Sequence, residues 1–166
     1  MRHYFCYSSS LDTAAFDEWK ASHGYDNFSL PHGERAKAMG VAYTFDFPSN
    51  YWGGRVVSLT PLEGFEATGN VEGMLYTISP EAWPILQHKE GVVTGASVET
   101  TIKVLANNRI VEATAFVTNP SRCGHHGPVS ARFLEVLARA YAKHGLTAGF
   151  ESVRQASIKT TNVVES

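Results

Sequence analysis

The sequence predicts an α+β fold in which a mixed or antiparallel sheet curls into a small barrel with flanking helices. About five or six runs with strand-like patterns outnumber the helical runs, and many of them follow one another directly along the chain. Two of these runs, residues 98–105 and 110–117, flank Asn107-Asn108, and asparagine tolerates the positive φ of a tight hairpin turn. Adjacent strands of this kind favour an antiparallel or mixed sheet.

Helices are expected at three places, and the first two are marked mainly by their ends. Either Ser10 or Asp12 can cap the first helix, and Gly24 ends it. The second helix is expected to start at Ser79-Pro80-Glu81, because proline and an acidic residue favour the first turn. The remaining strands are expected over residues 3–7, 35–47, 55–59 and 70–78.

The third helix has the clearest pattern in the chain. It is expected over residues 130–143, and Gly145 ends it. Residues 159–166 are polar and are expected to form a C-terminal tail, which leaves residues 1–158 as a single domain. The apolar residues that share one face of the third helix are Phe133, Leu134, Leu137 and Tyr141.

Composition narrows the classes of protein to which the chain can belong. It has 166 residues, of which 43% are hydrophobic and 18% charged, with a formal net charge of -2 and no basic block. Nucleic-acid and membrane-surface binding therefore have no electrostatic support. The two cysteines, Cys6 and Cys123, cannot form a disulfide framework. A reducing, cytoplasmic location is expected, because the first residues also lack the apolar run of a signal peptide.

Two motifs combine a proton carrier with backbone donors. Glu90 lies in Gln87-His88-Lys89-Glu90-Gly91-Val92, between a short helical run and a strand. The first strand ends in Tyr7-Ser8-Ser9-Ser10-Leu11, a turn whose backbone N–H groups can face a ligand. A carboxylate beside such a turn suits acyl transfer without a covalent nucleophile. One serine is explained by helix capping, which leaves two without that role.

The order of these motifs resembles that of the γ-glutamylcyclotransferase superfamily over roughly residues 3–155. Members begin with Tyr-Gly-Ser-Asn-Leu after a strand and later carry Glu-Gly-Val, as at Glu90-Gly91-Val92. The other matching motifs are Trp52-Gly53-Gly54-Arg55-Val56-Val57, Val71-Glu72-Gly73-Met74-Leu75-Tyr76 and the helix start at Ser130 to Leu134.

The resemblance implies a reaction and a site. Family members cyclise a γ-glutamyl group by attack of its α-amine on its own γ-carbonyl, which releases an amine and 5-oxoproline. Glu90 is then the acid/base, the partner is a small γ-glutamyl substrate, neither a metal nor an organic cofactor is needed, and a homodimer is allowed. The residues expected to bind the substrate are Tyr7, Ser8, Ser9, Ser10, Leu11, Gly53, Gly54, Phe116 and Phe133.

The chain also departs from the family pattern at four positions. Ser8 replaces the usual glycine and Ser10 the usual asparagine, so that either Ser8 is strained or the turn differs. Phe116 and Phe133 replace tyrosines, and each change removes a hydroxyl. We therefore predict a less polar pocket that prefers γ-glutamyl groups on apolar amines over glutathione-like peptides.

Two other functions remain open at this stage. One is a non-catalytic ligand-binding domain on the same fold, and the other is an amide hydrolase in which water attacks. No Gly-x-Ser-x-Gly motif of a serine hydrolase is present. Cys123-Gly124-His125-His126 has no second cluster of matching spacing, which favours a polar loop over a metal site.

Overall fold

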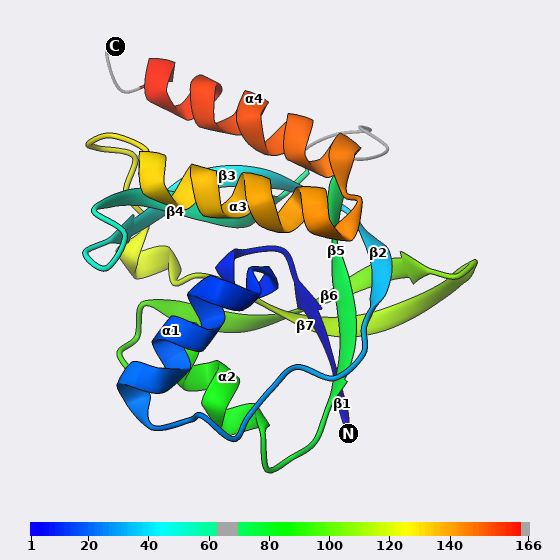
Figure 1. Ribbon diagram of the computed structural model, residues 1–166. Helices are drawn as coiled ribbons and strands as arrows, with labels where there is room; N and C mark the ends of the chain where they lie inside the picture. The colour runs from blue at the N-terminus through cyan, green and yellow to red at the C-terminus, as the bar shows by residue number, and fades with distance from the viewer. Residues whose placement is uncertain (63–69, 164–166) are drawn as a thin grey trace.

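The computed structural model of the protein describes residues 1–62 and 70–163 (Figure 1). The elements are β1 (Arg2–Cys6), η1 (Ser9–Leu11), α1 (Thr13–His23), β2 (Glu34–Met39), β3 (Val41–Ser49), β4 (Gly54–Pro61), β5 (Val71–Ile78), α2 (Trp83–Lys89), β6 (Ser97–Ala106), β7 (Arg109–Thr118), η2 (Pro120–Arg122), α3 (Ala131–His144) and α4 (Thr147–Val163). Among these described elements, strands follow one another directly from β2 to β5 and from β6 to β7, and two helices end the described chain.

Five of the described strands close into a barrel in the order β1-β5-β2-β6-β7. Neighbours within this order pair antiparallel, and the barrel closes where β1 and β7 pair in parallel, with Tyr4 opposite Thr114. The interior is filled by side chains such as Phe5, Val71 and Val104, which are fully buried. The predicted α+β class with a mixed sheet curled into a small barrel is confirmed.

A separate two-stranded sheet, β3–β4, carries the helical layer that completes the fold. In Figure 1, α3 and α4 lie side by side over this sheet, and α1 and α2 lie below α3 in the view. Arg55 in β4 pairs with Val129, which leads into α3. The second sheet is therefore joined through β4 to the segment that begins α3.

The prediction of one long strand over residues 35–47 is wrong. Gly40 has a φ of +74° and separates β2, which belongs to the barrel, from β3, which belongs to the second sheet. A residue with a side chain is strained at this φ, whereas glycine is not. The alternation of apolar residues continues across Gly40, so periodicity alone did not reveal the change of sheet.

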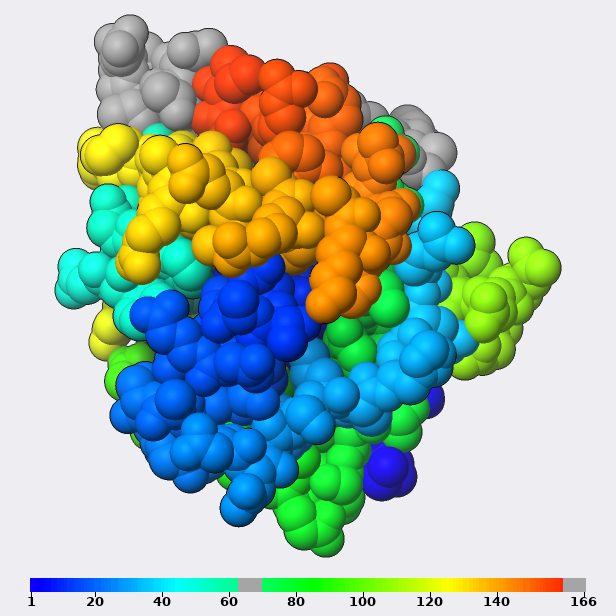
Figure 2. All heavy atoms as spheres, in the orientation of Figure 1, coloured from blue at the N-terminus to red at the C-terminus, as the bar shows by residue number. Residues whose placement is uncertain are grey.

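The hairpin and helix ends agree closely with the sequence. Asn107 and Asn108 have φ values of 47° and 62° and join β6 to β7, in a hairpin whose tip projects from the body of the molecule (Figure 2). Asp12 caps α1, and Gly24 ends it. Ser130 caps α3, and its hydroxyl accepts the N–H of Phe133 at 3.1 Å.

Two helical predictions need correction. α2 begins at Trp83 rather than at Ser79, because the preceding residues form a turn in which the N–H of Ala82 donates to the carbonyl of Ser79 at 3.1 Å. Of the tail expected over residues 159–166, residues 159–163 are the C-terminal end of α4, and residues 164–166 lie outside the described residues. The fully buried Val153 packs α4 onto the core, which stabilises a helix of weak intrinsic propensity.

None of the helices in the described parts of the chain is both long enough and apolar enough to span a membrane.

Candidate active site

Glu90 is anchored through its backbone at the end of α2. Its N–H donates to the carbonyl of Leu86 at 2.9 Å, which completes the last turn of the helix. Its carbonyl accepts the hydroxyl of Ser97 in β6 at 2.5 Å. Because the N–H and the carbonyl of Glu90 are both hydrogen-bonded, its side chain leaves the helix in a defined direction, toward β1 and the turn that follows it.

The carboxylate of Glu90 is held asymmetrically. Oε1 accepts the Tyr4 hydroxyl at 3.2 Å and the Ser10 hydroxyl at 3.0 Å. Within the described residues, no protein group donates a hydrogen bond to Oε2, and no Lys, Arg or His nitrogen lies within ion-pair distance of the carboxylate. One oxygen therefore positions the group, and the other is available to exchange a proton with a ligand.

Tyr4 is a rigid donor to this carboxylate. Its ring is 2% exposed and packs edge-on against Trp83 and Phe116. Burial, followed by the nearby Cys6 and Glu90, raises the pKa of Tyr4 well above its usual value, so that the phenol keeps its proton. Burial likewise raises the pKa of the Cys6 thiol to about 12, with Glu90 as the next contributor. Cys6 is therefore a neutral thiol and not an activated nucleophile.

The turn after β1 faces Glu90 without backbone strain. Ser8 has φ −118° and ψ −156°, an extended conformation that any residue adopts, so the predicted strain at Ser8 is absent and the turn follows a path that needs no glycine. The first hydrogen bond of the turn runs from the N–H of Leu11 to the carbonyl of Ser8 at 3.0 Å. The N–H groups of Ser9 and Ser10 precede this bond, as in the first turn of any helix.

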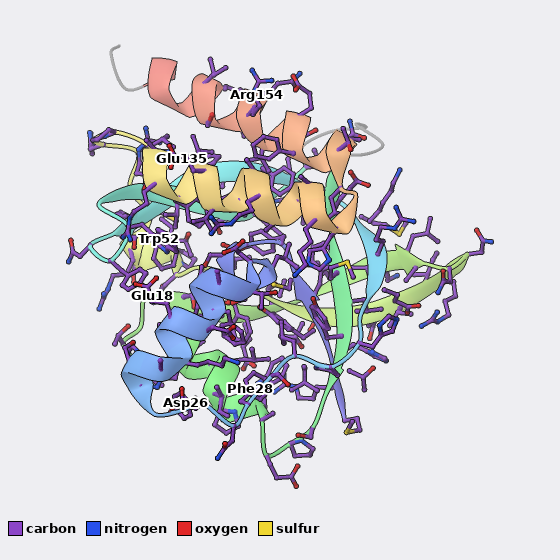
Figure 3. The ribbon with its side chains drawn as sticks, in the orientation of Figure 1. Glu18, Asp26, Phe28, Trp52, Glu135 and Arg154 are labelled. Atoms are coloured by element: carbon purple, nitrogen blue, oxygen red, sulfur yellow. The ribbon has the colours of Figure 1, made fainter. Side chains whose placement is uncertain are left out.

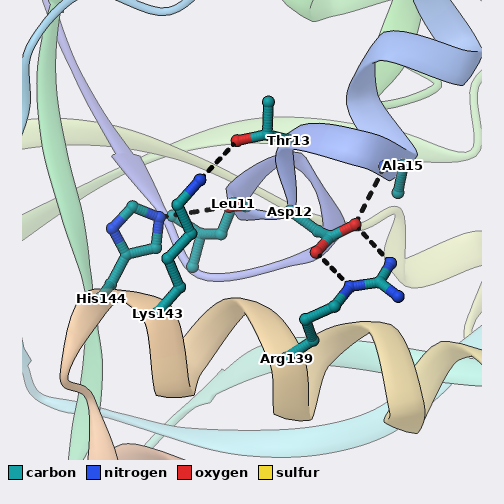
Figure 4. A network of polar contacts seen from close by, with 7 residues as sticks. All are labelled: Leu11, Asp12, Thr13, Ala15, Arg139, Lys143 and His144. Atoms are coloured by element: carbon teal, nitrogen blue, oxygen red, sulfur yellow. Dashed lines mark hydrogen bonds and ion pairs between the residues drawn. The ribbon is translucent and has the colours of Figure 1, made fainter.

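Asp12 holds the far end of the turn (Figure 4). Its Oδ2 accepts the N–H of Ala15 at 2.9 Å and so caps α1, while Arg139 of α3 binds both carboxylate oxygens at 2.8 and 2.7 Å. The Arg139 guanidinium lowers the pKa of Asp12 below its usual value. His144 adds a hydrogen bond to the carbonyl of Leu11 at 3.2 Å. The turn is thus fixed to α3, and the serines are free of the capping role.

Glu90 opens onto a cavity of about 210 Å³ between α1, α3 and the end of the β3–β4 sheet. Figure 3 shows Trp52, on the turn between β3 and β4, close to the N-terminal end of α3, where its ring packs edge-on against Phe133. Aromatic and aliphatic groups form most of the wall. The lining residues are Tyr7, Ser8, Ser9, Trp19, His23, Phe47, Ser49, Tyr51, Trp52, Val56, Val57, Lys89, Glu90, Ser97, Phe116 and Phe133.

Comparisons with known proteins agree with this architecture. Residues 70–151 match the AIG2-like family. An uncharacterised protein from Homo sapiens superimposes with a TM-score of 0.72 at 16% identity, over 99% of this chain and 98% of that one. A protein named γ-glutamyl cyclotransferase superimposes with a TM-score of 0.66 at 17% identity, over 87% of this chain and 80% of that one. The chain therefore has the γ-glutamylcyclotransferase-like fold.

A longer structure also contains this fold. YkqA from Bacillus subtilis superimposes with a TM-score of 0.67 at 22% identity over 86% of this chain, which spans only 48% of the length of YkqA. A search of curated proteins finds no match to the sequence. The γ-glutamylcyclotransferase-like fold is thus established here by structure and by the partial family match.

Most of the residues that the sequence predicts for the site do meet around the cavity. Ser10 lies behind the wall, where its hydroxyl reaches Glu90. Tyr7 contributes its ring to the cavity wall, because its hydroxyl donates a hydrogen bond to the carbonyl of Phe116 at 2.5 Å. The predicted residues on the cavity wall are Tyr7, Ser8, Ser9, Glu90, Phe116 and Phe133.

Three predicted residues lie elsewhere. Leu11 is 2% exposed and packs into the core rather than lining the cavity. Gly53 and Gly54 line a separate hollow beside residues 126–128. A Cβ on Gly54 would lie 2.9 Å from the carbonyl oxygen of Pro128, so this glycine allows the chain before α3 to approach β4. The sequence predicted that a ligand would approach the backbone at this glycine, but it is the chain before α3 that does so.

Two site residues were missed in the sequence. Tyr4 stands in a strand as an ordinary buried aromatic, and only the pairing of β1 in the barrel brings it to Glu90. Lys89 precedes Glu90 and looks like a solvated residue at a helix end, yet it lines the cavity and its Nζ donates to the hydroxyl of Ser9 at 3.2 Å. The only sequence signal for Lys89 was its adjacency to the candidate acid/base.

The loop that contains Cys123 is tied to a buried carboxylate. The Cys123 thiol donates to Asp46 at 3.4 Å, and the Thr118 hydroxyl donates to the other oxygen of Asp46 at 2.8 Å. Within the described ranges, no three His, Cys, Asp or Glu side chains gather in a group that could hold a metal ion. The contacts of this loop are thus those of a structural connection between β3 and β7.

Proposed function

We propose that the protein is a γ-glutamyl cyclotransferase that releases 5-oxoproline and an amine from a γ-glutamyl amide. The observation that carries this proposal is the carboxylate of Glu90 on the cavity wall, with Oε1 held by two hydroxyls and Oε2 open. The AIG2-like match and the neighbour named γ-glutamyl cyclotransferase support it. The expected homodimer and the expected cytoplasmic location stay predictions.

The reaction needs one proton carrier. Glu90 takes a proton from the α-ammonium, and the free amine then attacks the γ-carbonyl carbon of the same molecule. As the ring C–N bond forms and the amide C–N bond breaks, Glu90 returns its proton to the leaving nitrogen. The second ammonium proton, released on ring closure, leaves with the amine in its charged form. Because both reacting groups belong to one molecule, no covalent enzyme intermediate is required.

The negative charge that develops on the γ-carbonyl oxygen needs hydrogen-bond donors. The turn after β1 offers the N–H groups of Ser9 and Ser10, which precede its first internal hydrogen bond, and Ser9 lines the cavity. Donors fixed before the reaction stabilise such a charge without reorganising. The contacts of Asp12 with Arg139 hold this turn in place.

The remainder of the cavity favours a small, apolar leaving group. Phe116 and Phe133, which stand where relatives have tyrosines, both line it, and Trp19 and Trp52 extend the aromatic wall. Its volume of about 210 Å³ is below the range of about 300–1,000 Å³ that is usual for drug-sized ligands. The two phenylalanine rings offer no hydrogen bond to the polar groups of a peptide placed against them, and each buried group left unpaired costs about 1–3 kcal/mol.

A substrate panel tests this proposal. The purified protein is incubated with γ-glutamyl alkyl and aryl amines, γ-glutamyl amino acids and glutathione, and 5-oxoproline and glutamate are measured by mass spectrometry. We expect 5-oxoproline, with the highest kcat/KM on the apolar amines. Glutamate in place of 5-oxoproline would identify an amide hydrolase, and binding without either product would identify a non-catalytic domain. Higher efficiency on glutathione would disprove the leaving-group preference alone.

A further inference from the structure

The cavity wall carries a positive charge directly beside its carboxylate. Lys89 is the one lysine or arginine on the wall within the part of the chain that the structure describes. Its Nζ donates to the hydroxyl of Ser9 at 3.2 Å, and Ser9 is 5% exposed and so a fixed partner. No carboxylate among the described residues forms an ion pair with Lys89. The ammonium therefore faces the cavity without a counter-charge from the protein.

The opposite charges of Lys89 and Glu90 match the head of a γ-glutamyl group. Its α-carbon carries an ammonium, which must reach Glu90, and a carboxylate, which needs a cation or several N–H donors. Consecutive residues on the wall of one small cavity present these two charges together. Charge-assisted hydrogen bonds of this kind are shorter and stronger than neutral ones.

We propose that Lys89 binds the α-carboxylate of the γ-glutamyl substrate and so determines which acyl groups the protein accepts. This assignment rests on the proposed cyclotransferase reaction. With the carboxylate on Lys89, rotation about the α-carbon is restricted, and the ammonium is directed to Oε2 of Glu90. An acyl group with an amine but no carboxylate lacks this orientation and is a poor substrate.

The matched analogue is a 4-aminobutyryl amide, which is a γ-glutamyl amide without its α-carboxylate. It undergoes the same ring closure, in which the amine attacks its own carbonyl and 2-pyrrolidinone and the amine are released. We expect the protein to prefer the γ-glutamyl amide by about 10- to 100-fold in kcat/KM, the usual range for one charged hydrogen bond. The same amine is used in both substrates, so that the leaving group cannot cause the difference.

The experiment measures this preference in Lys89→Met, Lys89→Arg and the control Lys143→Met, with thermal unfolding of each variant. Lys143 lies outside the cavity and donates to the hydroxyl of Thr13 at 3.1 Å. In Lys89→Met the preference should fall to within a few-fold of unity because kcat/KM falls for the γ-glutamyl amide only. Lys89→Arg should retain much of the preference, and Lys143→Met all of it.

The outcomes separate the two proposals. If the unaltered protein forms lactam from neither substrate, the cyclotransferase proposal fails, and the assignment of Lys89 fails with it. If the unaltered protein prefers the γ-glutamyl amide and Lys89→Met keeps that preference, only the assignment of Lys89 is wrong. Equal loss on both substrates in Lys89→Met would also overturn it, because a merely structural lysine would affect both.

Discussion

Glu90, at the end of α2, and Asp12, at the end of the turn after β1, are two carboxylates that hold contacts with the same turn, and their surroundings differ in almost every respect. Asp12, whose side chain is 6% exposed, is bound by the Arg139 guanidinium through both oxygens and caps α1. Glu90 receives only neutral hydroxyls, both on Oε1, and faces a cavity. A carboxylate with all its partners in the protein stabilises the fold, whereas one with an open oxygen is available to a ligand. This contrast separates a structural carboxylate from the one that we propose to be catalytic.

The strongest test of this contrast is Glu90→Gln. The amide keeps the oxygen that accepts from Tyr4 and Ser10 but cannot take a proton, so turnover should fall by roughly 100- to 10,000-fold. The free energy of unfolding should change little, because those hydrogen bonds survive. Product formation and urea unfolding are measured together. Glu112→Gln, on the exposed side of β7, is the matched control, and near-normal turnover in Glu90→Gln would show that Glu90 is not the proton carrier.

Asp12 should behave in the opposite way. Asp12→Ala removes the cap of α1 and should lower the free energy of unfolding by about 0.5–2 kcal/mol from that contact alone. Turnover well below the unfolding temperature should fall far less than in Glu90→Gln, because Asp12 does not line the cavity and affects the serine turn only indirectly, through its contact with Arg139. Urea titrations and initial rates measure the two effects. A loss of turnover as large as that of Glu90→Gln, in a folded variant, would remove the distinction between the carboxylates.

The charge of Asp12 also predicts a dependence of stability on pH. Its pKa is lower in the folded than in the unfolded state, so its contribution is complete above the unfolded value of about 3.9 and is lost as the pH falls through the folded value. Asp12→Asn keeps a capping oxygen without the charge. Unfolding measured between pH 7 and pH 3 should therefore show a smaller decline below about pH 4 in this variant than in the unaltered protein. Parallel declines would exclude the ion pair as the cause.

The smallest effect is expected for Tyr4→Phe. This change keeps the packed ring and removes one of the two hydroxyls that hold Oε1 of Glu90. Turnover should fall by about 3- to 10-fold, less than for a lost contact with the substrate, because Ser10 still holds the same oxygen. KM should change less than kcat, because Tyr4 positions Glu90 and does not line the main cavity. If KM rises and kcat is unchanged, Tyr4 acts on substrate binding instead.

The parts of this molecule that were predictable from sequence are those determined by local chemistry. Asn107 and Asn108 mark the hairpin, and Ser130 and Gly145 mark the ends of α3, because caps and turns depend on a few neighbouring residues. The change of sheet at Gly40 was not predictable, since the apolar alternation continues through it. α4 was missed because threonine, glycine and serine weaken its pattern and packing on the core stabilises it instead.

The site was predictable only in part, for a similar reason. Glu90 and the serine turn were each predicted from a short motif, and the residues of each motif lie within a few positions of one another. Tyr4 and Lys89 join them through contacts that span 86 and 80 residues, and no local pattern encodes such contacts. Gly53 and Gly54 were predicted to let a ligand approach the backbone. Nothing in the sequence indicated that Pro128 would make this approach, at Gly54, instead.

The closure of the barrel by the first and last of its strands has a consequence for how the protein is made. During synthesis, β1 leaves the ribosome long before β5 and β7, the two strands with which it pairs. Tyr4 and Ser10 therefore cannot meet Glu90 until most of the domain is available, and such long-range pairing slows folding because distant segments must be brought together first. A nascent chain interrupted before β7 cannot close the barrel, so the arrangement of Glu90 with Tyr4 and Ser10 is completed only near the end of translation.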